Sequence, residues 1–485
     1  MKLKELLVGV EVIEFCADEE MEISGICYDS RQAAPGQLFT AVTGFASDGH
    51  RFIPMAVNKG AAAVLCERAP ETDVPYILVA NTRYSLAIVS GNFYGNPAKK
   101  MKMIGITGTN GKTTSTYLIK HMLEQCLGAK VGLIGTNANM IGDTELHTER
   151  TTPESLELHK LFADMYDAGC THVVMEVSSH ALVLDRVAGI KFDVASFSNL
   201  TQDHLDFHKD MDDYACAKAM LFTRSLSGSV NADDPYSSVM LSAATCPVLT
   251  YSIDNDADLR AEDIVLEPSG IHFKASFKGE TRNIYLGIPG RFSVYNALCV
   301  ISCGLQLGIS LERCAEALAS AKGVKGRVET VPTDGDYTVI IDYSHTPDSL
   351  ENVLKTVREA TKGRVVALFG CGGDRDKAKR PIMGRIGTEL SDFAIITSDN
   401  PRTEDPDEII AEILAGVSVP SERYVAVTDR IEAIRYAINN HLPGDIIVLA
   451  GKGHETYQEI NHHKIHMDER EIVADWLEKR KGAAK

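Results

Sequence analysis

The segment Gly108-Thr109-Asn110-Gly111-Lys112-Thr113-Thr114 constrains the fold of this chain more than any other. An apolar run at residues 103–106 precedes it and predicts a short buried strand, and residues 116–127 place apolar side chains at helical spacing. A strand, a glycine-rich turn, a lysine and hydroxyl residues that open a helix are typical of a phosphate-binding loop. We therefore expect a bound nucleoside triphosphate, with Lys112 on its phosphates and the Thr113 hydroxyl on Mg²⁺.

This loop departs from the strict GxxxxGK[ST] pattern, because Ile106 stands where the first glycine belongs. A glycine-rich turn before a helix can also be a purely structural feature. The preceding strand and the Lys-Thr-Thr run favour the triphosphate interpretation.

Composition limits the classes of function. A chain of 485 residues exceeds one hydrophobic core, so several domains are expected. Eleven cysteines without a CxxC pair indicate free thiols in a reducing cytosol, and Cys371 is interpreted as a packing residue. A net charge of −18 argues against a nucleic-acid-binding face. No apolar run approaches the roughly 20 residues of a membrane span, and the N-terminus does not resemble a signal peptide. We expect a cytoplasmic monomer that acts on small molecules, without nucleic acid or membrane insertion.

Three regions follow one another. Residues 1–98 mix short apolar runs with turns and predict a small N-terminal α/β domain. Residues 99–328 predict a central parallel sheet with helices around the phosphate loop, and residues 329–485 repeat the alternation as a Rossmann-like domain. The fold class is therefore α/β with three domains. The expected strands are 37–41, 62–66, 76–79, 103–106, 131–134, 172–177, 194–196, 229–230, 337–341, 364–369, 393–397 and 445–449, and further helices are expected at 214–222, 349–360 and 406–415.

Polar residues follow two strands of the middle region. Glu176 ends the strand at 172–177, and the carboxyl ends of parallel strands face the ligand crevice, so Glu176 can reach a metal held by the triphosphate. The next strand leads into a stretch with Asp203, His204, Asp206 and His208, which is either a magnesium site or a polar loop with capping aspartates. On its pattern alone, Lys218 is a solvated lysine on an amphipathic helix.

These segments resemble the Mur ligases, the ATP-dependent amide-forming enzymes of peptidoglycan precursor synthesis. The resemblance spans the chain and includes GTNGKTT, EVSSH, DHLDFH, the AKAMLF lysine, DNPR and GKGHE. It implies that ATP phosphorylates a substrate carboxylate to an acyl phosphate, which an amine then attacks. It also implies that Lys218 is carbamylated, so that the modified side chain can ligate Mg²⁺.

The resemblance implies a set of ATP-binding and catalytic residues. The catalytic residues are Lys112, Glu176, His204 and Lys218, and the metal ligands are Thr113, Glu176, His204 and carbamylated Lys218. ATP is expected at Gly108, Thr109, Asn110, Gly111, Lys112, Thr113, Thr114, Asn296, Arg327, Asp342 and His345. The last four place the nucleotide between two domains, so that domain closure completes the site.

Two further residue sets are carried over from the family. Ser30, Thr43, Gly44, Phe45, Thr151, Thr152, Ser178 and Arg186 match positions that hold a UDP-N-acetylmuramoyl dipeptide. Leu184 departs from the glutamine of some family members, so one peptide contact can differ. Arg375, Asp399, Asn400, Pro401, Arg402, Gly451 and Glu455 match positions that hold meso-diaminopimelate.

The Arg402 side chain gives a physical reason for this amino acid. Diaminopimelate differs from lysine by a second carboxylate, which a guanidinium can bind with two hydrogen bonds, while Glu455 can take an ammonium. Lysine would leave Arg402 unpaired, which disfavours it.

Three alternatives remain. They are a lysine-adding relative, a folylpolyglutamate-type ligase with the same GTNGK loop, and a P-loop NTPase that acts as a switch. The DNPR segment and the N-terminal Asp29-Ser30-Arg31 speak against the second. Phosphate release that depends on diaminopimelate, lysine or glutamate would separate the ligases, and hydrolysis without an acceptor would indicate the switch.

Overall fold

The computed structural model describes residues 1–44, 47–205, 207–267 and 270–483, so that Phe45 lies outside the described residues. Its contacts divide the chain into two compact units. The first comprises Met1–Leu200, His204–Asp258 and Cys299–Ser310, and the second comprises Thr201–Asp203, Leu259–Leu298 and Leu311–Lys485.

The first unit begins with a five-stranded sheet in the order β1-β5-β4-β3-β2, in which β1 alone runs antiparallel. Leu38, Leu65 and Ile77 from its strands pack with Leu3 and Leu86 from its helices in one core. The strands are Val12–Cys16, Gly25–Cys27, Gln37–Thr40, Ala63–Cys66 and Tyr76–Val79 (β1–β5), and the helices are Leu3–Leu6, Ile53–Asn58 and Thr82–Phe93 (α1–α3).

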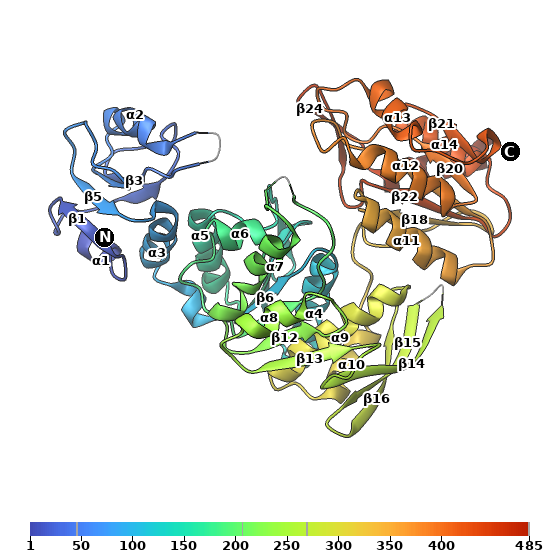
Figure 1. Ribbon diagram of the computed structural model, residues 1–485, viewed down its shortest axis with the longest axis horizontal. Helices are drawn as coiled ribbons and strands as arrows, with labels where there is room; N and C mark the ends of the chain where they lie inside the picture. The colour runs from blue at the N-terminus through green and yellow to red at the C-terminus, as the bar shows by residue number, and fades with distance from the viewer. Residues whose placement is uncertain (45–46, 206, 268–269, 484–485) are drawn as a thin grey trace. The chain divides into compact units, whose positions relative to one another are not determined.

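A larger sheet follows in the same unit, with parallel strands in the order β13-β12-β11-β6-β10-β7 and the antiparallel strands β8 and β9 beyond β7 (Figure 1). The strands are Lys102–Thr107, Val131–Ile134, Asn139–Ile141, Thr144–Leu146, His172–Glu176, Val194–Phe197, Gly228–Asn231 and Val248–Ser252 (β6–β13). The helices are Lys112–Leu127, Ser155–Asp167, Ser179–Val183, Met211–Ala219 and Ser237–Ala243 (α4–α8).

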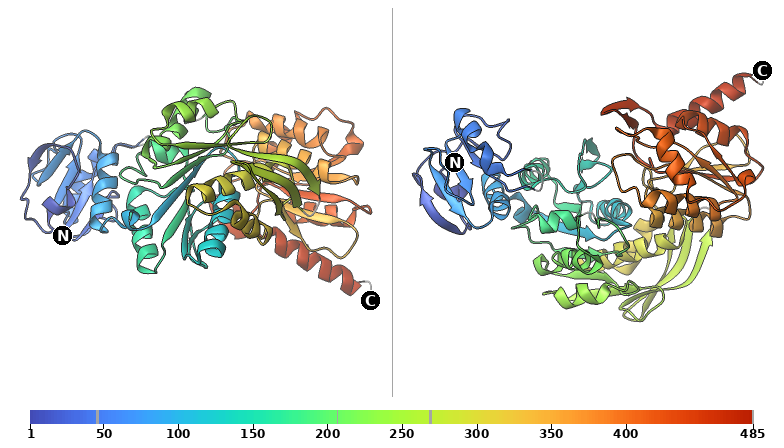
Figure 2. Two further views of the ribbon diagram at one scale, coloured as in Figure 1. Left: turned by 90° about the horizontal axis from the view of Figure 1, so that it is seen from below. Right: turned by 45° about the horizontal axis from the view of Figure 1, so that its top comes forward.

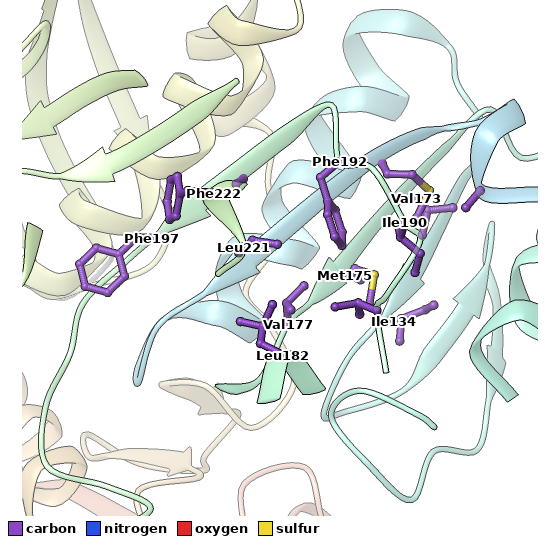
Figure 3. Packing of buried hydrophobic residues seen from close by; sticks show 14 of the residues in the cluster. Ile134, Val173, Met175, Val177, Leu182, Ile190, Phe192, Phe197, Leu221 and Phe222 are labelled. Carbon is purple, nitrogen blue, oxygen red and sulfur yellow. The ribbon is translucent and has the colours of Figure 1, made fainter. Parts of the chain in front are cut away.

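The core of this sheet fixes the position of the phosphate loop. Figure 3 shows Met175 and Val177 beside Phe192, in a cluster of buried apolar side chains. A Cβ at Gly105 of β6 would lie 2.9 Å from the Phe192 ring, so the ring packs directly on the backbone of the strand that leads into the loop. A close-packed contact of this kind holds the end of β6 rigidly.

The second unit contains three consecutive antiparallel strands, β14 to β16, and a second parallel sheet. The strands are Leu259–Glu267, Gly270–Phe277 and Glu280–Leu286 (β14–β16), Glu329–Val331, Thr338–Asp342, Val365–Phe369, Phe393–Ile396, Tyr424–Ala426 and Ile446–Ala450 (β17–β22), and Tyr457–Ile460 and His463–His466 (β23–β24). The helices are Arg291–Gln306, which spans both units, Leu311–Ala319, Pro347–Ala360, Lys379–Glu389, Pro406–Leu414, Arg430–Asn439 and Glu469–Ala483 (α9–α15).

The second parallel sheet has the order β17-β18-β22-β19-β20-β21 and is covered on both faces. Successive residues of β19 alternate between two cores: Val365 and Ala367 pack with α11, α12 and α13, and Val366 and Leu368 pack with α14 and α15. The terminal helix α15 packs against α14 at the red end of the chain (Figure 2). A strand buried on both faces reads as a continuous apolar run, which is why the sequence pattern located it.

The predicted strands are confirmed, each with ends within one residue of those observed. Helix α4 begins at Lys112, so that the hydroxyl residues after this lysine lie in its first turn, as predicted, and the apolar residues of 116–127 follow within it. The sequence analysis did not predict the three antiparallel strands β14 to β16. The eleven cysteines are free thiols, and Cys371 packs its Sγ 3.6 Å from the Met383 sulfur, as expected. Among the described residues, no helix has the length and apolar character needed to cross a membrane.

Candidate active site

The phosphate loop is built from backbone that only glycine adopts without strain. Gly108 has φ +145° and Gly111 has φ +84°, and a Cβ at Gly108 would lie 2.0 Å from the Ser198 Oγ. Gly111 directly precedes α4, so the positive N-terminal end of the helix dipole adjoins the loop. This arrangement is a site for a phosphate anion.

Two lysine side chains meet at one carbonyl of this loop. Lys112 Nζ donates to Gly108 O at 2.9 Å and to Thr109 O at 2.8 Å, and Lys218 Nζ donates to Gly108 O at 2.8 Å. Lys218 is 1% exposed and its Nζ lies 4.3 Å from the centre of the Tyr214 ring. The interpretation of Lys218 as a solvated lysine is therefore wrong, because its side of α7 faces the core and the phosphate loop.

Glu176 lies at the carboxyl end of β10, directly beside the phosphate-loop strand in the sheet. Its carboxylate is 1% exposed and accepts hydrogen bonds from Thr136 N at 2.9 Å and Thr136 Oγ1 at 3.0 Å. A Cβ at Gly135 would lie 2.5 Å from Glu176 Oε1, so a larger residue there would displace the carboxylate. Two hydrogen bonds leave further lone pairs on the two oxygens for a cation.

Asn199 is a site residue that the sequence reasoning did not assign. It follows β11, on the other side of β6, and its Oδ1 accepts from Asn110 N at 2.9 Å while its Nδ2 donates to Asn110 O at 3.1 Å. The Asn199 carbonyl accepts from Thr109 N at 2.8 Å. Asn199 thus binds both backbone polar groups of Asn110 in the loop. Its place at a strand exit, like that of Glu176, was the available signal.

The histidines after β11 have different environments. His204 has φ +55° and its ring lies edge-on to the rings of His180, at 4.9 Å, and Tyr214, at 6.1 Å. His208 is 2% exposed and contacts Asp213 at 3.1 Å and Ser179 Oγ at 2.8 Å. These contacts within the protein favour the polar loop over the magnesium site for this residue. Within the described ranges no three His, Cys, Asp or Glu side chains group as a metal site, and Asp206 lies outside them.

Four residues expected at the dipeptide come together beside Glu176. Thr152 Oγ1 donates to Glu176 O at 2.8 Å and contacts Ser178 Oγ at 3.3 Å, and Thr151 Oγ1 lies 3.0 Å from Thr136 Oγ1. Arg186 Nη1 donates to Thr152 O at 3.0 Å, and its Nη2 pairs with Glu154 at 2.8 Å. These contacts join the predicted dipeptide residues to the predicted metal ligand Glu176.

The residues expected at the uridine diphosphate lie on loops of the first sheet. Ser30 is buried, with its Oγ 3.4 Å from the Met55 sulfur, and Thr43 Oγ1 donates to Glu67 at 3.0 Å. A Cβ at Gly44 would lie 2.8 Å from Ser47 O, so the turn needs glycine. Their contacts as described do not link them to the Glu176 group.

The remaining ATP residues lie in the second unit. Asp342 ends β18 and its Oδ2 accepts from Val328 N at 2.8 Å, while the Arg327 guanidinium stacks over the Tyr343 ring at 4.9 Å. His345 Nδ1 lies 2.8 Å from Tyr343 O, and Asn296 is 5% exposed on α9. Asp342 therefore fixes the backbone next to Arg327.

The amino-acid residues gather at the carboxyl ends of two strands of the second parallel sheet. Asn400 Nδ2 donates to Glu455 Oε2 at 3.0 Å, which joins the DNPR segment after β20 to the GKGHE segment after β22. Pro401 lies between Asn400 and Arg402, and a Cβ at Gly451 would lie 2.4 Å from Asp399 Oδ2. Burial raises the pKa of Asp399, but Lys452 and Arg430 outweigh it, so the pKa lies below its ordinary value.

Arg402 is held firmly and is not unpaired. It has φ +51°, its Nε donates to Glu459 Oε2 at 3.2 Å, and its Nη1 donates to Gly373 O at 2.8 Å. Discrimination against lysine therefore cannot rest on an unpaired guanidinium. Arg375 does not join the group by its described contacts, because its exposed side chain donates to Asp374 O at 3.2 Å.

Two buried basic side chains that contact the DNPR and GKGHE segments or the residues next to them were not predicted as site residues. Arg430, 1% exposed, donates to Ser398 O at 3.3 Å and Ala450 O at 2.8 Å and pairs with Glu469 at 2.8 Å. It thus ties together the two residues that precede Asp399 and Gly451. Lys452, fully buried, contacts both Asn400 and Glu455.

The donor set fits a nucleoside triphosphate with Mg²⁺. The Gly108 and Gly111 backbone and Lys112 suit phosphate, and the Thr113 hydroxyl and Glu176 carboxylate are the hard oxygen ligands that Mg²⁺ prefers. An ammonium cannot ligate a cation, so Lys218 fits only as the carbamate.

Comparisons with known proteins place the chain. Family models match three consecutive stretches: Mur ligase family, catalytic domain, at residues 22–106; Mur ligase middle domain, at 106–304; and Mur ligase, glutamate ligase domain, at 326–453. A UDP-N-acetylmuramoyl-L-alanyl-D-glutamate–2,6-diaminopimelate ligase of Clostridium tetani is 49% identical over 485 residues and 99% of each chain. A solved structure under the same enzyme name is 31% identical over 99% of each chain, with a TM-score of 0.73. A folylpolyglutamate synthase of Mycobacterium tuberculosis covers 76% of this chain and 92% of its own at 19% identity and a TM-score of 0.63, a likeness of fold alone.

Proposed function

The chain belongs to the Mur ligase family, and we propose that it adds meso-diaminopimelate to the D-glutamate γ-carboxylate of UDP-N-acetylmuramoyl-L-alanyl-D-glutamate, with ATP, in peptidoglycan precursor synthesis. It is an ATP-dependent ligase that forms an amide bond. The observation that carries the choice of amino acid is the joined DNPR and GKGHE pair, in which Arg402 and Glu455 present opposite charges within one small group. Full-length relatives with this enzyme name support it.

The reaction proceeds in two steps. The γ-carboxylate attacks the γ-phosphorus of ATP, which gives an acyl phosphate and ADP; the diaminopimelate amine then attacks the acyl carbon and phosphate leaves. Lys112 and the loop N–H groups hold the phosphates, and no residue needs to become a covalent nucleophile. The chain thus contributes mainly position and charge.

Thr113, Glu176, His204 and carbamylated Lys218 would hold Mg²⁺, which neutralises charge on the phosphates when bound. For carbamylation the Lys218 ammonium would first lose a proton, and the neutral amine would then add CO₂ and release a second proton, so a buried cation becomes an anion. The Lys218 side chain already lies against Gly108 O. A carbamate there would stand beside the phosphate loop.

Thr151, Thr152, Ser178 and Arg186 would orient the dipeptide, because their contacts join the Glu176 backbone. Ser30, Thr43 and Gly44 would hold the uridine diphosphate. Asn296, Arg327, Asp342 and His345 would serve ATP from the second unit. These assignments rest on the family resemblance.

Recognition of diaminopimelate would use both charges of its distal centre. Among the described contacts of Arg402, Nε and Nη1 are engaged and Nη2 is not, so a substrate carboxylate can bind at Nη2 without breaking them. That bond is charge-assisted and is lost with lysine, a difference of about 1.5–3 kcal/mol.

The alternatives predict a different acceptor. A lysine-adding enzyme would work as well without the second carboxylate, and a folylpolyglutamate-type ligase would use glutamate. Phosphate release from the purified chain with UDP-N-acetylmuramoyl-L-alanyl-D-glutamate and each amino acid in turn separates them; equal rates with lysine and diaminopimelate would refute the choice made here. We also propose that the enzyme acts as a monomer in the cytoplasm on these small molecules.

A further inference from the structure

Lys452 of the GKGHE segment is a fully buried ammonium between two residues of the amino-acid group. It is 0% exposed, and its Nζ donates to Asn400 Oδ1 at 2.7 Å and to Glu455 Oε2 at 2.6 Å. The Tyr457 ring lies 5.2 Å from the same nitrogen. Because burying an unpaired charge is costly, these two partners stabilise the side chain in its buried position.

Lys452 fixes which way the Asn400 amide points. Asn400 Oδ1 accepts from Lys452 Nζ and also from Glu459 N at 2.9 Å, and Nδ2 donates to Glu455 Oε2 at 3.0 Å. A flipped amide would place its NH₂ group against two donors and its oxygen against a carboxylate. The ammonium therefore selects one orientation.

Lys452 also fixes the Glu455 carboxylate by one of its two oxygens. Both Lys452 Nζ and Asn400 Nδ2 donate to Oε2, and over the described residues no hydrogen bond reaches Oε1. The Glu455 side chain is 14% exposed. Oε2 is therefore anchored, and Oε1 keeps its lone pairs for a further donor.

We propose that Lys452 is a positioning residue for the amino-acid substrate: it holds Asn400 and Glu455 so that Glu455 Oε1 receives the substrate ammonium. This inference rests on the function proposed above. Lys452 itself does not touch the substrate. Without it, Asn400 can flip and Glu455 loses its anchor, so the amino acid binds less tightly while ATP and the nucleotide sugar are unaffected.

Lys452→Ala tests this, with Lys464→Ala as the matched control. Lys464 also contacts the Tyr457 ring, with its Nζ 4.4 Å from the ring centre, but it lies on the exposed strand β24. We expect Lys452→Ala to raise the KM for diaminopimelate about thirty-fold, the effect of losing a charge-assisted hydrogen bond. The KM values for ATP and the nucleotide sugar should stay within about two-fold, and Lys464→Ala should match the wild type.

Chemical rescue distinguishes positioning from packing. Propylammonium in the buffer should restore the KM of Lys452→Ala, whereas 1-propanol, of similar size but uncharged, should not. If Lys452→Ala does not fold, Lys452→Met keeps most of the volume and carries the same KM comparison. An unchanged diaminopimelate KM, or equal rescue by propanol, would overturn the inference. A wild type that does not use diaminopimelate would instead overturn the proposed function.

Discussion

At the scale of single residues, the proposed binding of Mg²⁺ beside the phosphate loop depends on the charge of Lys218. This side chain is buried against Gly108 O of the phosphate loop, where an ammonium would compete with Mg²⁺ and a carbamate would bind it. We expect Lys218→Ala to lower ligation about 10²–10³-fold, as for loss of an electrostatic stabiliser. Ligation is measured as ADP release that depends on diaminopimelate.

Short carboxylates should restore part of this activity, because formate or acetate can occupy the place of the carbamate. Lys209→Ala, an exposed lysine before α7, is the control and should behave as the wild type. A Lys218→Ala enzyme that is fully active, or one on which carboxylates have no effect, would contradict the carbamate role.

Arg402 is the second residue with a specific prediction. Its Nε and Nη1 are engaged by Glu459 and Gly373, which leaves Nη2 for the distal carboxylate of diaminopimelate. Arg402→Lys cannot reproduce this planar fork, so the KM for diaminopimelate should rise about thirty-fold, or roughly 2 kcal/mol, with little change for ATP.

The exposed Arg385→Lys on α12 is the control for that measurement. Arg402→Lys should also discriminate less than the wild type between diaminopimelate and lysine. Equal increases in the KM values for ATP and diaminopimelate would show that Arg402 does not anchor the substrate.

At the scale of elements, the phosphate loop depends on a neighbouring strand exit. Asn199, after β11, holds both polar groups of Asn110 in the loop after β6. Asn199→Ala removes both of these hydrogen bonds, so the KM for ATP should rise about ten-fold while the KM for diaminopimelate stays constant. Initial rates at varied ATP test this, with the exposed Asn283→Ala on β16 as control; an unchanged ATP KM would mean that the loop keeps its shape without Asn199.

Packing between α3 and α5 predicts a pH dependence of stability. His159 on α5 is 4% exposed beside Gly91 of α3, and burial lowers its pKa to about 4 from 6.5. As the pH falls, His159 therefore becomes protonated in the unfolded chain at a higher pH than in the folded protein. The contribution of neutral His159 to the free energy of unfolding is complete above pH 6.5. It is lost between about pH 6.5 and 4, at roughly 1.4 kcal/mol per pH unit.

Urea unfolding of wild type and His159→Leu at pH 7 and pH 5 measures this contribution. The wild type should lose more stability than the variant over that interval, and the exposed His147→Leu should follow the wild type. Equal losses in wild type and His159→Leu would show that His159 is not held neutral.

The sequence predicted elements better than it predicted buried polar side chains. Strands such as β19 are buried on both faces, so their apolar runs were evident before the structure. Lys218 and Lys452 follow no such pattern, because a buried charge depends on partners far away in the chain, such as Gly108 and Asn400. Motif resemblance located Lys218, and for Asn199 the signal in the local sequence was its place at the exit of a predicted strand.

At the scale of the whole molecule, motif residues collect at the carboxyl ends of parallel strands in two separate sheets. In the first unit these strands are β11, β6 and β10, which are neighbours in the sheet. In the second they are β18, β22, β19 and β20, again neighbours. This is the crevice edge of open α/β sheets, and it explains why motifs far apart in the sequence gather in each unit. The domain boundaries near residues 98 and 328 stay a prediction.

The central claim is that ATP is spent on joining diaminopimelate to the nucleotide-linked dipeptide. The direct measurement is ADP release by the purified enzyme with ATP, Mg²⁺ and UDP-N-acetylmuramoyl-L-alanyl-D-glutamate, on addition of meso-diaminopimelate, L-lysine or L-glutamate, with the product mass determined. We predict release with diaminopimelate at least ten-fold faster than with lysine or glutamate, and a product heavier by one diaminopimelate residue. ADP release that is independent of the amino acid, or equal rates with lysine, would contradict the claim.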